Sequence, residues 1–252
     1  MGASWNGASR VRRLRRLLHG AAFAAILVGL AFALYALARN RPQDLPWTPL
    51  DLGETPGLFT GRKLAALGAT PKACGALLDR AGVRYTELPT VRGERCGYTD
   101  GVRLASGGAR RIGFSPTGVG MACPVAAGLA MLEWNVLQPA AEAHFGARVR
   151  MIEHFGSYSC RRMYGRASGD WSEHATADAF DVAGFVLSDG TRISVVRDWK
   201  GHGPKAAFLH AVRDGACGLF ATVLSPDYNA AHRDHLHLDQ AERGATGWRA
   251  CR

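Results

Sequence analysis

The sequence predicts an α+β fold in which an antiparallel sheet is flanked by helices, with one transmembrane helix before the domain. Residues 20–38 carry no charge and are preceded by a group of arginines. Beyond them, some segments repeat apolar residues at helical spacing, and others alternate β-favouring residues. Helical segments lie before and between the predicted strands, which favours α+β over a regular alternation of strands and helices.

The N-terminal part of the sequence predicts a cytoplasmic segment, a membrane span and a linker before the main domain. Five arginines between Arg10 and Arg16 precede residues 20–38, a stretch that at about 1.5 Å per residue nearly crosses a hydrocarbon core of roughly 30 Å. Positive charge stays on the cytoplasmic side, so we expect residues 1–19 in the cytoplasm and the C-terminal bulk outside it. Residues 39–56, with four prolines, are expected to be a linker, and residues 57–252 the exported domain.

A cleavable signal peptide is the alternative to a retained anchor. Ala36-Leu37-Ala38 resembles an A-x-A cleavage site. The apolar stretch is long for a signal peptide, however, and Arg39 and Arg41 follow it directly. These features favour a single-pass membrane anchor.

The net charge of +10 arises mainly in this N-terminal part. Residues 1–43 hold seven arginines and neither an acid nor a lysine, and removing those seven charges leaves +3. The remainder is only mildly basic and has no RNA- or DNA-binding motif. We therefore expect no nucleic-acid partner.

The cysteines predict a disulfide framework. They are six in number, spread over the exported part without a C-x-x-C pair, at positions 74, 96, 123, 160, 217 and 251. An even number of cysteines in an oxidising compartment is typical of disulfides rather than zinc ligands. We expect Cys74 to pair with Cys96, and Cys160 with Cys217.

Periodicity and proline positions place the elements. Helices are expected at residues 61 to about 84, from 124 to 138, and at 205–217. Pro139 is expected to kink or end the second of these. Strands are expected at residues 83–88, 96–104, 148–154, 179–187, 191–196, 222–224 and 236–238. A turn at residues 188–190 would make a hairpin, which puts Asp181 on a central strand.

Residues 172–181 and 232–237 predict a metal site in a cleft of the sheet. His174 and Asp181 are seven apart, which suits a loop residue and a residue of the following strand, and His237 would join them from a neighbouring strand. Two imidazoles and a carboxylate, with the fourth position left for water, are typical of hydrolytic zinc centres. A single histidine is more often structural, but several ligand-type residues in two short segments favour Zn2+ as cofactor.

These residues also match a known pattern. Ser172-x-His174-x-x-Ala177-x-Ala179-x-Asp181 with His235-x-His237 resembles the S-x-H-x-x-G-x-A-x-D and H-x-H signature of the LAS zinc metallopeptidases. That group includes D-alanyl-D-alanine carboxypeptidases, murein endopeptidases and the hedgehog signalling domain. This chain departs from the signature at Ala177, where the pattern has glycine.

A second resemblance covers about 200 residues. The chain is similar to the bacterial extensin-like protein C-terminal family, with a metallopeptidase-like core at about residues 120–245. The motifs that carry this resemblance are Pro46-Trp47-Thr48-Pro49, Cys123-Pro124-Val125, His154-Phe155-Gly156-Ser157-Tyr158-Ser159-Cys160-Arg161 and Ser225-Pro226-Asp227-Tyr228-Asn229.

The LAS resemblance implies roles for residues near the metal. His174, Asp181 and His237 would hold zinc, which lowers the pKa of a bound water toward about 7. Two residues compete as general base: Asp234 matches the acidic position of some branches, and His232 the H-x-x-H-x-H spacing of others. His235 is expected to project from the same strand face as His237 and to hydrogen-bond a ligand or the reaction intermediate.

The resemblance also suggests residues that support the chemistry. Arg161 is the expected charge-stabilising group, because a guanidinium can bind a peptide carboxylate or a developing oxyanion. Arg162 and Arg166 are the alternatives. Ser172 and Glu173 are expected to orient the loop, and Asp239 is expected to be structural or supporting rather than catalytic.

Together these features predict a membrane-anchored, periplasmic, zinc-dependent peptidase in a bacterial inner membrane. Its expected substrates are peptidoglycan peptides, cut in carboxypeptidase or endopeptidase mode. The alternative is a non-catalytic cell-wall or protein-binding domain with structural zinc or none, since the hedgehog case implies that this fold can keep zinc while serving to bind. A disulfide-held scaffold without metal is the third possibility.

Overall fold

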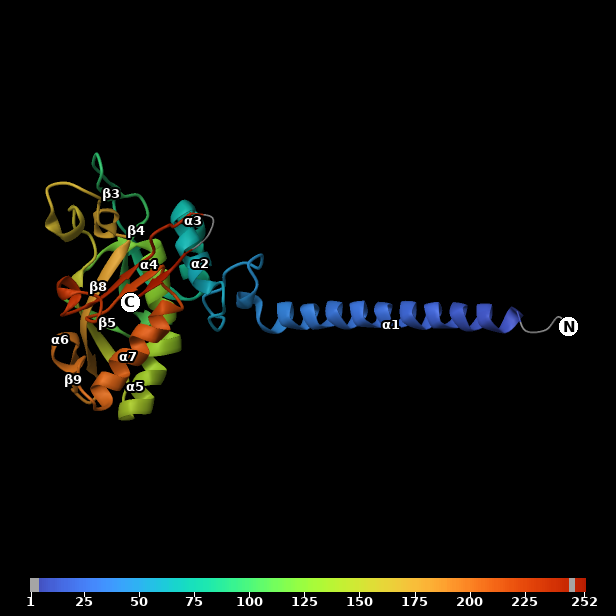
Figure 1. Cartoon of the computed structure of the whole chain (residues 1–252). Coiled ribbons are helices and arrows are strands. Elements are labelled where there is room, and N and C mark those ends of the chain that lie inside the picture. Colours follow the sequence, from blue (N-terminus) through green and yellow to red (C-terminus); the bar gives the residue numbers. More distant parts are fainter. Residues whose placement is uncertain (1–4, 245–247) are drawn as a thin grey trace.

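A computed structural model describes residues 5–244 and 248–252 and has one long helix extending from an α+β domain (Figure 1). The α-helices of this described chain are α1 (Trp5–Asn40), α2 (Thr60–Ala65), α3 (Pro71–Arg80), α4 (Cys123–Leu132), α5 (Gln138–Phe145), α6 (Val195–Asp198) and α7 (Pro204–Cys217). Shorter helical turns are η1 (Pro42–Asp44), η2 (Ala66–Ala69), η3 (Glu133–Leu137), η4 (Met163–Gly165), η5 (Glu173–Thr176) and η6 (Ala230–His232).

The strands of the same residues follow in chain order. They are β1 (Val83–Glu87), β2 (Val91–Arg92), β3 (Gly97–Tyr98), β4 (Gly101–Gly108), β5 (Gly113–Ser115), β6 (Met121–Ala122), β7 (Val149–Gly156), β8 (Ala179–Leu187), β9 (Arg192–Ser194), β10 (Thr222–Leu224), β11 (Leu236–Asp239) and β12 (Ala250–Cys251). The α+β class, the antiparallel pairing and the N-terminal apolar helix are confirmed.

The main sheet positions the candidate site. Its order is β12-β10-β11-β8-β7-β5, with β9 also pairing with β8. The four inner strands are antiparallel, while the edge strands β5 and β12 pair in parallel with β7 and β10. Asp181 lies on β8, directly opposite His237 of β11 and Gly156 of β7. The prediction that Asp181 lies on a central strand is confirmed.

A long apolar helix covers the core. Every residue of α4 is buried, as is nearly every residue of β8. The helical path continues past Pro139 into α5 through the π-helical segment η3. Proline removes a helical hydrogen bond and crowds the preceding turn, and a wider π turn accommodates it. Pro139 therefore does not end the helix: it is the second residue of α5 and directly follows the π-helical segment.

The hairpin after β8 is shorter than predicted. Gly190 lies in the predicted turn, but β9 ends at Ser194 and the chain turns helical from Val195. Asp198 Oδ2 accepts the backbone N–H of Ser194 at 2.7 Å, which satisfies a donor at the start of α6. The predicted strand at residues 191–196 was therefore wrong at its C-terminal end.

The disulfide framework is confirmed, but both predicted pairings are wrong. The bonds join Cys74 to Cys123, Cys96 to Cys160, and Cys217 to Cys251, with Cα atoms 5.6 to 6.1 Å apart. Separation along the sequence does not decide the pairing, because a bond needs Cα atoms brought within reach by packing. For example, α3 packs against α4, which brings Cys74 to Cys123.

The N-terminal helix is long and apolar enough to cross a membrane. Within α1, the segment Arg10–Asn40 contains an 18-residue window with mean hydropathy 2.3. Beyond it, the proline-rich segment packs on the domain, since Gln43 and Leu52 are buried. Lys63 Nζ donates to Gln43 Oε1 at 3.2 Å and to Thr48 Oγ1 at 2.9 Å. The chain that joins helix to domain is therefore folded against α2.

Candidate metal centre

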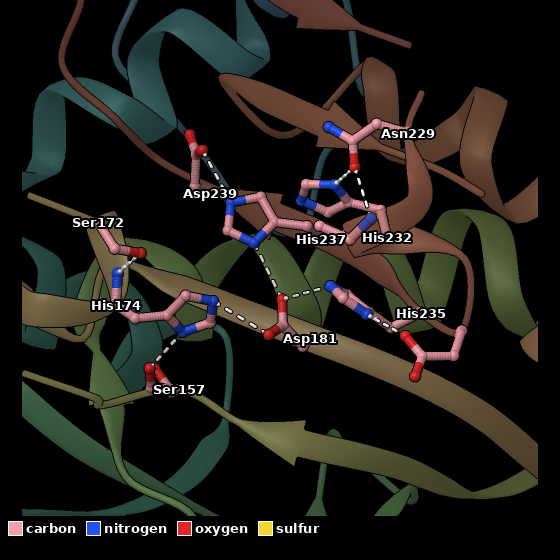
Figure 2. A network of polar contacts seen from close by, with 11 residues as sticks. Ser157, Ser172, His174, Asp181, Asn229, His232, His235, His237 and Asp239 are labelled. Atoms are coloured by element: carbon pink, nitrogen blue, oxygen red, sulfur yellow. Dashed lines mark hydrogen bonds and ion pairs between the residues drawn. The ribbon is translucent and has the colours of Figure 1, made fainter. Parts of the chain in front are cut away.

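Three elements bring His174, Asp181 and His237 together (Figure 2). They come from η5, β8 and β11, and one ligand-type atom of each lies within 4.8 Å of the other two. His174 Nε2 is 3.1 Å from Asp181 Oδ2, and His237 Nδ1 is 2.9 Å from Asp181 Oδ1. The three residues are 3%, 7% and 9% exposed, respectively. The structure thus assembles the predicted ligand set in a protected position.

In both histidines, the ring nitrogen that faces away from Asp181 contacts an oxygen acceptor. His174 Nδ1 donates to the backbone carbonyl of Ser157, and His237 Nε2 lies 3.2 Å from Asp239 Oδ2. An acceptor behind one ring nitrogen fixes the ring and turns the other nitrogen toward a metal, as in many histidine-ligated sites. Asp239 therefore occupies the supporting position expected for it.

The surroundings of His174 Nε2 in particular suit a metal ligand. His174 Nε2 is buried and has no hydrogen-bond partner among the described residues, although it lies close to the Asp181 carboxylate. A buried nitrogen without a hydrogen bond is unfavourable unless something else contacts it. Two imidazole nitrogens and a carboxylate are the donors that Zn2+ prefers, so these residues fit that ion.

The charged groups of the site shift one another's pKa values. Burial disfavours ionisation of Asp181, yet its contacts with His174 and His237 hold its pKa below the ordinary value. Burial also disfavours the protonated ring of His237, but Asp181 and Asp239 on its two sides raise its pKa to about 9. In the metal-free protein at neutral pH, an imidazolium thus lies between two carboxylates.

The metal-free protein is therefore expected to lose stability as the pH rises. The pKa of His237 is raised from 6.5 to about 9. Its contribution to the free energy of unfolding is therefore complete below about pH 6.5 and is lost as the pH passes through about 9. The melting temperature of chelator-treated protein, measured from pH 6 to 10, should fall across this window. The fall should be absent in His237→Gln, and equal profiles for the two proteins would contradict the assignment.

The loop between the first two ligands is held by local contacts. Ser172 Oγ accepts the N–H of His174 at 3.3 Å, so Ser172 caps η5 as its expected orienting role requires. Ala177 ends the turn in the left-handed region, with φ of 60° and ψ of 15°. Its carbonyl accepts from the Ser157 hydroxyl at 3.0 Å. Ala177 thus adopts the conformation for which glycine is favoured, and the ligands still meet.

Replacing Ala177 by glycine is expected to stabilise the protein slightly. A non-glycine residue in the left-handed region costs about 1–2 kcal/mol, which glycine would avoid. Glycine in turn loses more chain entropy on folding, which offsets roughly 0.5–1 kcal/mol of that gain. We expect the free energy of unfolding to rise by about 0.5–1 kcal/mol in urea titrations. Ala177 and Ala179 are equally buried, but Ala179 has the strand conformation of β8, so the same change there removes a buried methyl group without relieving strain and should lower the free energy of unfolding. A loss of stability in Ala177→Gly would contradict the strain argument.

The other predicted histidines also reach the site, and each is held by a neighbour. His235 Nε2 lies 3.5 Å from Asp181 Oδ1, and its Nδ1 lies 2.9 Å from Asp234 Oδ1. His235 therefore does face the same side as His237, since both approach Asp181. The Asp234 carboxylate contacts His235, so Asp234 orients that ring.

His232 is held by a residue that the sequence analysis did not assign. Asn229 Oδ1 accepts the N–H of Ala231 at 2.9 Å and lies 2.8 Å from His232 Nδ1. Because this oxygen accepts, Nδ1 donates and the lone pair is on Nε2. Burial, together with His237 and His235, lowers the pKa of His232 to about 4, so the ring is neutral at pH 7. The sequence signal for Asn229 was its position three residues before His232, at the start of a helical turn.

Of the three candidate arginines, Arg161 borders the metal site. It lines both cavities that contain His174 and Asp181, one of about 720 Å³ and one of about 390 Å³. Arg162 instead lies over the Trp171 ring at 4.7 Å, and Arg166 over the Tyr164 ring at 5.2 Å. Glu173 also lines the larger cavity, and burial followed by repulsion from Asp239 raises its pKa.

Comparison with known proteins identifies the domain. No curated protein and no solved structure matches the chain. The family model described as "Extensin-like protein C-terminus" matches residues 72–252, which include all three candidate ligands and every cysteine from Cys74 to Cys251. More than half of the chain is covered. The chain therefore belongs to the extensin-like protein C-terminal family.

Proposed function

We propose that this protein is a zinc-dependent peptidase that acts on peptidoglycan peptides. The convergence of His174, Asp181 and His237 carries the proposal, because their inner atoms lie within 4.8 Å and the outer ring nitrogens are held by acceptors. The resemblance of the same residues to the LAS signature supports a peptidase in particular. Two cavities leave room for a peptide: the larger is lined by all three residues, and the smaller by His174 and Asp181.

Zinc bound to these three residues would polarise the scissile carbonyl and activate a water molecule. His232 is the stronger candidate base. Its Nδ1 donates to Asn229, which leaves the lone pair on Nε2, and the ring lines the larger cavity. The proton that His232 accepts can pass to the leaving amine. Asp234 acts through His235, whose Nε2 faces Asp181.

Arg161 supplies positive charge beside the reacting carbonyl. Its side chain borders both cavities next to His174 and Asp181. A guanidinium there stabilises the negative charge that develops on the carbonyl oxygen. The chain thus provides ligands, a base and an oxyanion partner around one cleft.

The rest of the chain supports a location in the bacterial periplasm. An apolar helix follows a basic N-terminal segment, and all six cysteines form disulfides. Disulfides persist in oxidising compartments, and the positive flank stays in the cytoplasm. We propose that α1 anchors the protein in the inner membrane and that the domain faces the peptidoglycan.

The test uses the full chain purified in detergent. Its metal content is measured by mass spectrometry, and purified muropeptides are then incubated with the zinc-loaded and the chelator-treated protein. We expect one zinc per chain and new cleavage products only with zinc. A protein that binds no zinc, or that carries zinc and leaves every muropeptide intact, refutes the proposal. Zinc-independent binding to sacculi in that case would favour the non-catalytic wall-binding alternative.

A further inference from the structure

The two cavities at the metal site adjoin each other. The larger, of about 720 Å³, and the smaller, of about 390 Å³, have five lining residues in common, namely Arg161, His174, Asp181, Ala231 and His235. Two of the three candidate metal ligands therefore lie in the wall between the cavities. A substrate carbonyl at the metal site would have space on both sides.

Each side is large enough for part of a ligand. Sites for small molecules usually occupy about 300–1,000 Å³, and both cavities fall within that range. The smaller one is bordered by the last two residues of β7 and the three that follow it, from Phe155 to Ser159. The larger one extends toward Trp171 and Trp248. The cleft thus continues past the metal site in two directions.

The position of the arginine indicates how the substrate lies. An enzyme that removes a terminal residue needs a cation at the end of one short arm, where the free carboxylate would lie. Arg161 instead lines both cavities and so lies where they meet. Arg243 and Arg252 also border the larger cavity, but at about 720 Å³ that cavity is not the short arm that a single terminal residue needs. Among the described residues, the one other charged side chain that borders the smaller cavity, apart from its histidines and Asp181, is the acid Asp234. A carboxylate in that arm would meet a like charge.

Exposed apolar side chains gather around both arms. Of the large exposed apolar side chains described beyond residue 41, most border one cavity or the other: Phe155 and Tyr158 the smaller one, and Met163, Tyr164, Tyr228 and Trp248 the larger. Grouped exposed apolar side chains mark binding surfaces. Both sides of the metal site therefore offer contacts to a substrate.

We propose that this protein cuts an internal peptide bond of a cross-linked peptidoglycan peptide, with substrate residues held on both sides of the metal site. The inference rests on the proposed function and makes it more specific. Water adds across the scissile C–N bond, so that the carbonyl carbon becomes a carboxylate and the nitrogen leaves as an amine. One product lies in each cavity.

The test compares two defined probes on the full chain in detergent. One is a cross-linked muropeptide dimer, and the other is an uncross-linked pentapeptide monomer. We expect the zinc-loaded protein to cut the dimer into two monomers and to leave the terminal residue of the pentapeptide in place. Release of that terminal residue with the dimer uncut overturns the inference and leaves the proposed function standing.

A variant that fills the smaller cavity tests the two-sided cleft directly. Ser159 lines only that cavity of the two, so Ser159→Trp should lower kcat/KM for the dimer at least tenfold, with a smaller loss in Ser159→Gln. Ser168→Trp, in the same segment between β7 and η5 but exposed and bordering neither cavity, should match the wild type. Circular dichroism checks that each variant is folded. Equal rates for Ser159→Trp and Ser168→Trp overturn the inference.

Binding separates this inference from the proposed function. Affinity for the dimer is measured by isothermal titration with the chelator-treated protein, where no cleavage occurs. Ser159→Trp should weaken this binding at least tenfold relative to Ser168→Trp. If neither probe is cut by the zinc-loaded protein, the peptidase proposal fails. Tenfold weaker dimer binding by Ser159→Trp would then still support the two-sided cleft, and unchanged binding would overturn it.

Discussion

Replacing Asp181 by asparagine is expected to abolish stoichiometric zinc binding and peptide hydrolysis while leaving the fold intact. Asp181 lies between both histidines, at 3.1 Å from His174 and 2.9 Å from His237, so its carboxylate is the one negative charge shared by the two rings. Loss of a group behind a metal ligand lowers metal affinity roughly 10–100-fold. Loss of the charged ligand itself should therefore exceed about 100-fold. Zinc affinity is measured by competition with a chromophoric chelator.

Comparing three aspartate variants distinguishes a metal ligand from a residue that only supports a ligand. Asp239→Asn keeps all three ligands and weakens only the contact behind His237, so we expect a loss of roughly 10–100-fold. Asp214→Asn, on the exposed face of α7, serves as the matched control and should leave zinc affinity unchanged. Equal affinities for the Asp181 and Asp214 variants would show that Asp181 holds no metal.

The sequence predicted where the three candidate ligands would meet, because each of them lies in a segment whose secondary structure can be read from its local residue pattern. His174 lies one short turn before a strand, and that strand is apolar enough to be recognised as central, so Asp181 had to lie inside the sheet. His237 lies on another short apolar strand, and antiparallel pairing placed it opposite Asp181. Motif spacing and strand periodicity were therefore sufficient for this part of the site.

The supporting contacts follow from tertiary structure and had weaker signals. Ser157 acts through its backbone carbonyl, an atom that every residue has, so no side-chain pattern could reveal it. Asn229 lies 2.8 Å from His232, but an asparagine before a helical turn is common without such a role. The disulfide pairings failed for the same reason, because Cys74 meets Cys123 only through the packing of two helices.

A buried ion pair at the C-terminal end of α4 had no sequence signal. Arg110 and Glu133 have side chains 0% and 2% exposed, with Arg110 Nε 3.0 Å from Glu133 Oε2. Glu133 Oε1 also accepts the backbone N–H groups of Arg111 at 2.7 Å and Ile112 at 3.2 Å. Glu133 therefore joins the start of the π-helical segment to the chain that leads into β5.

Glu133→Ala is expected to destabilise the domain by about 3–5 kcal/mol, since it leaves the Arg110 guanidinium buried without its partner and two backbone donors unsatisfied. Arg110→Met combined with Glu133→Gln should cost less than Glu133→Ala alone, because the glutamine oxygen can still accept both N–H groups and no buried charge remains. Urea unfolding followed by tryptophan fluorescence, with the disulfides intact, measures both.

An exposed ion pair provides the matched control. The Arg192 side chain is 64% exposed where it meets Glu153, and exposed pairs contribute roughly 0–1 kcal/mol. Arg192→Met should therefore stay within about 1 kcal/mol of the wild type. If Glu133→Ala cost no more than Arg192→Met, burial would not be what makes the Arg110 and Glu133 pair important. A larger loss in the double variant than in Glu133→Ala would instead show that the arginine stabilises the fold through packing, for example against Phe114, which its guanidinium approaches at 5.1 Å.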